Sequence, residues 1–123
     1  MIVWLPLEIL DQRYTKMWAE QCPREFKRLG IDYITIEGKQ LTSAIELGQV
    51  LDAYGTNYWK FTQLANLIAK IHSREITSND TLLFADIWFP GLEALEYISC
   101  LGGARPKITG VLHAGTYDSF DFT

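Results

Sequence analysis

The sequence predicts an α/β protein built on a four-stranded parallel sheet, and two observations carry that prediction. Four short runs rich in apolar residues alternate along the chain with longer stretches whose apolar residues recur at helical spacing. The excursion between the second and third runs is long, which favours a chain that returns past the first strand. We therefore expect the sheet order 2-1-3-4, with helices on both faces in three layers.

The first third of the chain predicts a strand, a helical segment and a second strand. Ile2–Leu5 is wholly apolar, as in a strand buried on both faces. From Asp11 to Leu29 the apolar residues form a helical stripe. Pro23 lies inside that stripe, so we expect either one kinked helix or two helices, the second beginning at Pro23. Ile31–Ile36 alternates and is β-branched, which predicts the second strand.

The rest of the chain continues this alternation. Residues 39–55 predict a loop followed by a short helix, because Gly48 weakens an otherwise helical pattern. The elements expected after it are a helix capped by Thr56 or Asn57 and ending near Ser73, a strand at Thr81–Phe89, a helix at Leu92–Leu101 and a strand at Lys107–His113. We find no linker, repeat or low-complexity tract, so residues 1–123 are expected to form one Rossmann-like domain.

Composition and charge exclude several classes of protein. The 123 residues are 48% hydrophobic and 21% charged, which is typical of a globular domain. A net charge of −4 argues against nucleic-acid binding. The apolar start is interrupted by Pro6 and Glu8 and has no basic leader, so neither a signal peptide nor a membrane span is expected and the predicted location is cytoplasmic. Cys22 and Cys100 are expected to be buried free thiols.

Aromatic residues and short motifs refine this picture. Aromatics make up 13% of the chain, so some of them should lie near the surface or in a site. Neither a G-x-G-x-x-G nor a P-loop pattern follows the first strand, which argues against dinucleotide-binding dehydrogenases and P-loop enzymes. No His/Cys cluster stands at the spacing of metal ligands, so we expect no metal and no tightly bound cofactor.

Candidate functional residues gather where the predicted strands end. In open parallel sheets, ligands bind at the carboxyl ends of the strands beside the point where the strand order reverses, here between the first and third strands. The residues near these ends that we select are Glu8, Asp86, Trp88, His113, Gly115, Tyr117 and Asp118.

His113 is the first choice for a catalytic residue, because it ends a strand and small residues follow it. It could bind a sugar hydroxyl or a phosphate, or carry a proton near neutral pH, and the alternative is a histidine bonded to a loop carbonyl. Asp86 either faces a cleft or is a structural acceptor that holds the turn at Pro90. Glu8 is either a ligand for a substrate hydroxyl or a surface charge, and Asp118 either binds a hydroxyl or a metal or forms a turn.

Two segments, Phe84–Glu93 and Val111–Asp118, resemble the amino-terminal half of a GT-B type glycosyltransferase of a kind found in phage-like and environmental sequences. Pro23–Asp32 and Leu51–Asn57 add to the likeness, which spans nearly the whole chain. The resemblance implies a Rossmann-like acceptor domain that is normally followed by a second domain, which binds a nucleotide-sugar donor. On that basis we expect residues 1–123 to be the amino-terminal half of a two-domain transferase.

The same resemblance assigns roles to single positions. It implies that His113 lines the cleft near the transferred sugar and that Gly115 allows the donor to approach closely. Glu8, Asp86 and Trp88 would line the acceptor side. The partners implied are a small-molecule sugar donor and acceptor. Nothing here resembles the glutamate-bearing motif of the second domain, so we expect at most weak activity from this chain alone. The uncovered edge of the sheet is expected to take a partner or a second copy.

A non-catalytic flavodoxin-like binding module stays open as the alternative, because the chain has no complete catalytic constellation. In that case the same loops, including Trp88 and Tyr117, would bind a partner protein or a small ligand. A phosphoacceptor receiver domain fits less well, since it requires paired acidic residues after the first strand and a lysine near the end, and neither pattern occurs.

Overall fold

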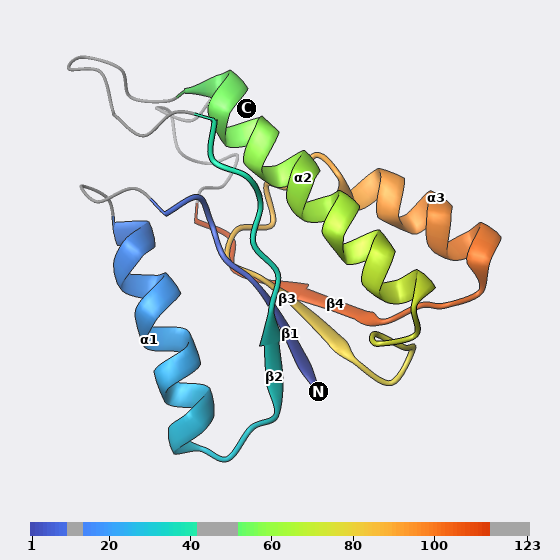
Figure 1. Ribbon diagram of the computed structural model, residues 1–123, viewed down its shortest axis with the longest axis horizontal. Helices are drawn as coiled ribbons and strands as arrows, with labels where there is room; N and C mark the ends of the chain where they lie inside the picture. Colours follow the sequence, from blue (N-terminus) through green and yellow to red (C-terminus); the bar gives the residue numbers. More distant parts are fainter. Residues whose placement is uncertain (10–13, 42–51, 114–123) are drawn as a thin grey trace.

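The computed structural model describes residues 1–9, 14–41 and 52–113, which form a parallel sheet with helices on both faces (Figure 1). In chain order the elements are β1 (Ile2–Leu5), α1 (Tyr14–Arg28), β2 (Tyr33–Thr35), α2 (Ala53–His72), β3 (Thr81–Phe84), α3 (Leu92–Gly102) and β4 (Lys107–Gly110). The strand order is β2-β1-β3-β4 and every neighbouring pair is parallel. This confirms the predicted fold class and sheet order.

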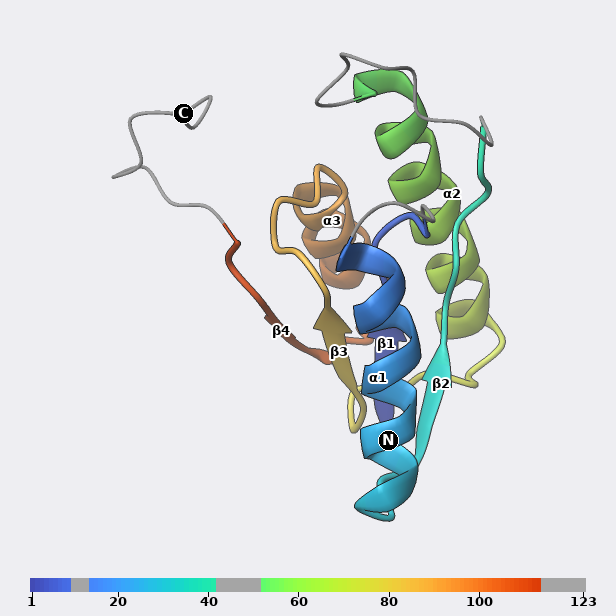
Figure 2. The ribbon, with the colours of Figure 1, turned by 90° about the vertical axis from the view of Figure 1, so that its left-hand side faces the viewer.

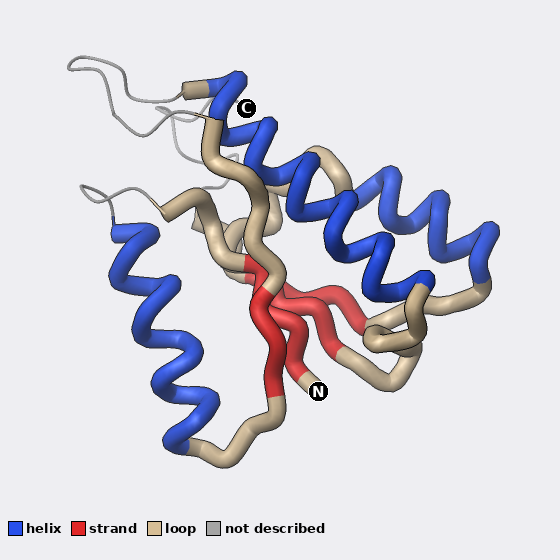
Figure 3. The backbone as a smooth tube through the Cα atoms, in the orientation of Figure 1, coloured by secondary structure: helices blue, strands red, loops and turns tan. Residues whose placement is uncertain are grey.

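The helices form two unequal layers around the sheet. Helix α1 covers one face, and α2 and α3 lie together on the other (Figures 2 and 3). The main core lies on the α2 and α3 side, because alternate strand residues point there. Its buried members are Val3, Leu5, Ile36, Leu64, Leu67, Ile76, Leu82, Phe84, Phe89 and Leu95. Trp4 contacts α1 instead, with its ring 6.2 Å from that of Phe26.

The strands are shorter than predicted. We expected a strand over Thr81–Phe89, but β3 ends at Phe84, and the apolar residues after it belong to a loop in which the Asp86 carboxylate accepts a bond from the Trp88 N–H. Similarly β2 covers only Tyr33–Thr35, and β4 ends at Gly110 and not at His113. In this loop Ala85 and Phe89 stay buried although they lie outside the ladder, so an apolar run alone does not mark where a ladder of hydrogen bonds stops.

The helices also differ from the prediction at their ends. Helix α1 is continuous through Pro23, so the two-helix alternative is wrong. Helix α2 begins before Thr56, because the Asp52 carboxylate caps it by accepting from the Gly55 N–H at 3.0 Å. Thr56 and Asn57 therefore lie inside the helix. Of residues 39–55, where a loop and a short helix were predicted, residues 42–51 lie outside the described residues and residues 53–55 belong to α2.

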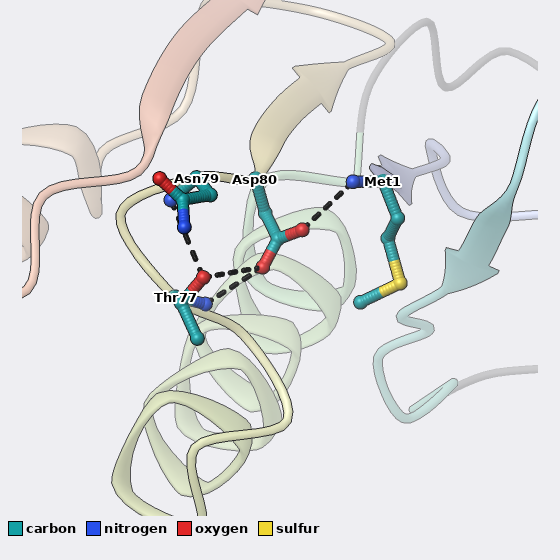
Figure 4. A network of polar contacts seen from close by, with 4 residues as sticks. All are labelled: Met1, Thr77, Asn79 and Asp80. Carbon is teal, nitrogen blue, oxygen red and sulfur yellow. Dashed lines mark hydrogen bonds and ion pairs between the residues drawn. The ribbon is translucent and has the colours of Figure 1, made fainter.

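An ion pair lies at the amino end of the sheet, where β1 and β3 begin (Figure 4). The amino group of Met1 donates to Asp80 Oδ1 at 2.8 Å, and Asp80 Oδ2 accepts from the backbone N–H of Thr77 at 2.7 Å. The bonds from the amino group and from Thr77 hold the pKa of the Asp80 carboxyl below its ordinary value. The start of β1 is thereby fastened to the turn that precedes β3.

Two surface expectations can be compared with the structure. β4 forms one edge of the sheet, and Ile108 on it is exposed, as is Leu112 just beyond it. Dimerisation through this edge stays a prediction.

Cys22 and Cys100 are free thiols, but the expectation that both are buried is wrong, since Cys100 is exposed on α3. Partial burial raises the pKa of the Cys22 thiol. Within the described residues no helix combines the length and apolar character needed to cross a bilayer.

Candidate functional site

The carboxyl ends of all four strands face the same end of the molecule, where α2 also begins (Figure 1). This follows from the parallel sheet, because each strand enters its loop at the same edge. Three of these loops carry the candidate residues that the structure describes. Glu8 follows β1, Asp86 and Trp88 follow β3, and His113 follows β4.

His113 is held by the loop that follows β3. Its Nε2 lies 2.6 Å from the carbonyl oxygen of Ala85, and its ring meets the ring of Trp18 edge-on with centroids 5.2 Å apart. Because a carbonyl can only accept, Nε2 carries a hydrogen and a neutral ring has its lone pair on Nδ1. This is the loop-carbonyl bond foreseen as the alternative, and it also sets the orientation of the ring.

Asp86 organises the loop after β3. Its Oδ1 accepts from the Trp88 N–H at 3.0 Å, the pattern of an Asx turn. Of the two roles predicted for Asp86, this contact is the one expected of a structural acceptor that shapes a turn. Trp88, two residues further on, is exposed, so its indole lies on the surface beside the site.

Lys60 on α2 belongs to the site and was not selected from the sequence. The residue is only 8% exposed, and its Nζ donates to the backbone carbonyl of Trp88. Burial lowers the pKa of the Lys60 ammonium, and the nearby Asp86 carboxylate opposes this shift. The sequence did contain a clue that Lys60 is buried. In the helical pattern Lys60 shares a face with Leu64 and Leu67, both of which are buried.

Glu8 lies in the interior, so the interpretation of it as a surface charge is wrong. The residue is 6% exposed, and its Oε2 accepts from the hydroxyl of Thr56 on α2 at 3.4 Å. The preceding Pro6 carbonyl accepts from Trp59 Nε1 at 3.1 Å and from Gln63 Nε2 at 2.9 Å. The loop after β1 is thus fastened to α2 by buried hydrogen bonds.

Gln63 joins two strand ends at once. Its Nε2 also donates to the Ile36 carbonyl, just after β2, at 2.8 Å. One side chain of α2 therefore sets the spacing between the loops that follow β1 and β2. Sequence reasoning missed this residue, because a glutamine in an apolar helix face has no pattern that identifies its partners.

Three predicted residues cannot be placed. Gly115, Tyr117 and Asp118 lie outside the described residues, so their roles stay predictions. Over the parts of the chain that are described, no group of three or more His, Cys, Asp or Glu side chains is positioned to hold a metal ion.

The described residues form a connected series across the end of the sheet. Contacts run from Glu8 to Thr56 on α2, and from Lys60 through the loop of Trp88 and Ala85 to His113. This places a buried carboxylate, a buried ammonium, an imidazole and an exposed indole around one edge. Polar groups and an aromatic side chain at the carboxyl ends of the strands are features of the place where open parallel sheets bind ligands. The chain matches no family model, no curated protein and no solved structure.

Proposed function

We propose that this chain is the acceptor-side half of a GT-B type glycosyltransferase, which moves a sugar from a nucleotide-sugar donor to a hydroxyl group of an acceptor. The observation that supports it most directly is the series from Glu8 through Lys60 to His113 at the carboxyl edge of the sheet. That edge is where open parallel sheets bind ligands. The resemblance of the segments around Asp86 and His113 to such enzymes gives the chemistry.

The reaction sets requirements that these residues can meet. A bond forms between the acceptor oxygen and the anomeric carbon, the bond from that carbon to the diphosphate oxygen breaks, and the proton of the acceptor hydroxyl passes to the departing diphosphate or to water. In our proposal the ring of His113, which the bond between Nε2 and the Ala85 carbonyl orients, lines the cleft beside the transferred sugar. The Glu8 carboxylate accepts from acceptor hydroxyls, and the nucleotide binds on a second domain.

The test is a transfer assay on the full open reading frame that contains this chain. Release of nucleoside diphosphate is measured with a panel of nucleotide sugars, and the product is identified by mass spectrometry. We expect His113→Ala to reduce turnover by about 100-fold or more, the usual contribution of a positioned acid, base or hydrogen-bonding group. The matched control is His72→Ala, because His72 is exposed at the far end of α2.

Three results would count against this proposal. Unchanged turnover of His113→Ala would remove His113 from the reaction, and equal losses in both histidine variants would point to a general effect. Absence of diphosphate release with every donor would overturn the function itself. Circular dichroism melting curves of each variant separate loss of chemistry from loss of fold.

One observation favours the binding-module alternative. The side chains of His113 and Asp86 both bond to backbone groups, as residues that only shape a loop would. If the module is the correct function, Trp88→Ala weakens binding of its partner while His113→Ala changes no turnover, because none exists.

A further inference from the structure

An open aromatic surface lies on α2 beside the candidate site. Tyr54, Tyr58 and Phe61 are spaced so that they share one face of the helix, and all three are exposed, Tyr54 by 87% and Phe61 by 53%. Together with Ala53, Asn57 and Pro90 they line one shallow hollow. We refer to these six residues as the aromatic platform.

The aromatic platform is continuous with the candidate site. The other face of α2 buries Lys60 and Gln63, which hold the loops after β3 and β1. Lys60 bonds the carbonyl of Trp88, only two residues before Pro90 of the aromatic platform. Helix α2 therefore presents its aromatic face next to the same loop that carries Asp86 and Trp88.

The chemistry of the lining residues indicates what binds there. None of the six is charged, which disfavours nucleotides, acidic lipids and nucleic acids, all of which require cations. None is leucine, isoleucine, valine or methionine, the residues that typically line grooves for apolar helices. A neutral sugar ring has one flat face of C–H groups and a rim of hydroxyls. Such a ring matches aromatic faces bordered by tyrosine hydroxyls and the amide oxygen of Asn57.

We propose that the aromatic platform binds a neutral oligosaccharide, so that the acceptor is an existing glycan chain whose terminal hydroxyl reaches the strand-end site. This inference rests on the proposed function and narrows its acceptor class. Sugar rings stack on Tyr54 and Phe61 while the reacting end lies toward Trp88. A protein side chain or a lipid headgroup is thereby disfavoured as the acceptor.

The experiment measures glycan binding by the 123-residue chain. The chain is applied to an array of neutral oligosaccharides built from glucose, galactose, mannose and N-acetylglucosamine, printed with sialylated and sulfated glycans. The strongest ligand is then titrated, with saturation-transfer NMR to locate the contacting ring protons. We expect binding to neutral glycans only, weakened about 2- to 12-fold by Tyr54→Ala, as one aromatic contact contributes. The matched control is Tyr97→Ala, because Tyr97 is a 67% exposed tyrosine on α3.

Two results of this experiment would overturn the inference. The first is that the chain binds no neutral glycan, and the second is that Tyr54→Ala and Tyr97→Ala weaken binding equally. Self-association that Tyr54→Ala abolishes, measured by analytical ultracentrifugation, would make a second copy of the chain the occupant. Failure of the proposed function can be distinguished from failure of this inference. Glycan binding without any transfer by the full reading frame overturns the transferase, whereas transfer whose acceptor KM is unaffected by Tyr54→Ala overturns only the aromatic platform.

Discussion

The two ends of the sheet both hold charged side chains that are largely buried, but with different partners. At the amino end the Asp80 carboxylate meets the Met1 amino group directly, at 2.8 Å, and two groups of Thr77 complete its bonds. At the carboxyl end Lys60 donates to a backbone carbonyl and Glu8 accepts from a hydroxyl. The buried ammonium of Lys60, whose pKa burial lowers, lies at the end of the sheet where open parallel sheets bind ligands, and shifted pKa values of this kind cluster at functional sites.

At the carboxyl end the neutral side chain of Gln63 links two loops through buried hydrogen bonds. Gln63→Leu should therefore show the largest effect, because it removes the donor shared by the buried Pro6 and Ile36 carbonyls. We expect the free energy of unfolding to fall by about 1 to 3 kcal/mol, the usual cost of an unsatisfied buried polar group. Urea unfolding followed by tryptophan fluorescence measures it. Gln21→Leu on exposed α1 is the control, and a loss as large there would contradict the comparison.

The amino end should respond to pH. Asp80→Asn removes the charge that pairs with Met1, and we expect a loss on the order of 1 kcal/mol at neutral pH, since the pair is partly exposed. The pKa of folded Asp80 is below its unfolded value, so this stabilisation is present above the unfolded pKa and lost as pH falls through the folded one. The difference between wild type and variant should shrink from about pH 5 to about pH 2. Denaturant titrations over that range test this, with Asp32→Asn as the exposed control. A constant difference would be the contrary result.

The smallest expected effect concerns Lys60. Because the pKa of folded Lys60 lies below its unfolded value, the unfolded chain binds more protons in the window between them, and stability rises with pH there. Wild type should therefore gain stability relative to Lys60→Met as pH approaches the ordinary lysine pKa of about 10.4. Unfolding at about pH 7 and about pH 10 measures the change. Lys27→Met on the exposed face of α1 is the control, and the same gain there would contradict burial as the cause.

Much of the candidate site could be predicted because parallel strands bring their carboxyl ends together. Glu8, Asp86, Trp88 and His113 were selected on that ground, and the structure places all four in the loops that follow β1, β3 and β4. Their partners could not be predicted. Gln63 reaches a carbonyl 57 residues away, and Lys60 reaches one 28 residues away. Contacts of that range depend on how α2 lies across the sheet and have no local pattern.

The sequence by itself determined the class of fold and the order of its strands. Alternating apolar and amphipathic stretches specify strands and helices, and the long connection after β2 directs the chain back past β1, so β2-β1-β3-β4 follows from local information. Only the tertiary structure decided where β3 stops, that Glu8 is buried, and that Lys60 and Gln63 bond the loops at the carboxyl end. Burial of a polar group requires a partner, and folding brings those partners from distant parts of the chain.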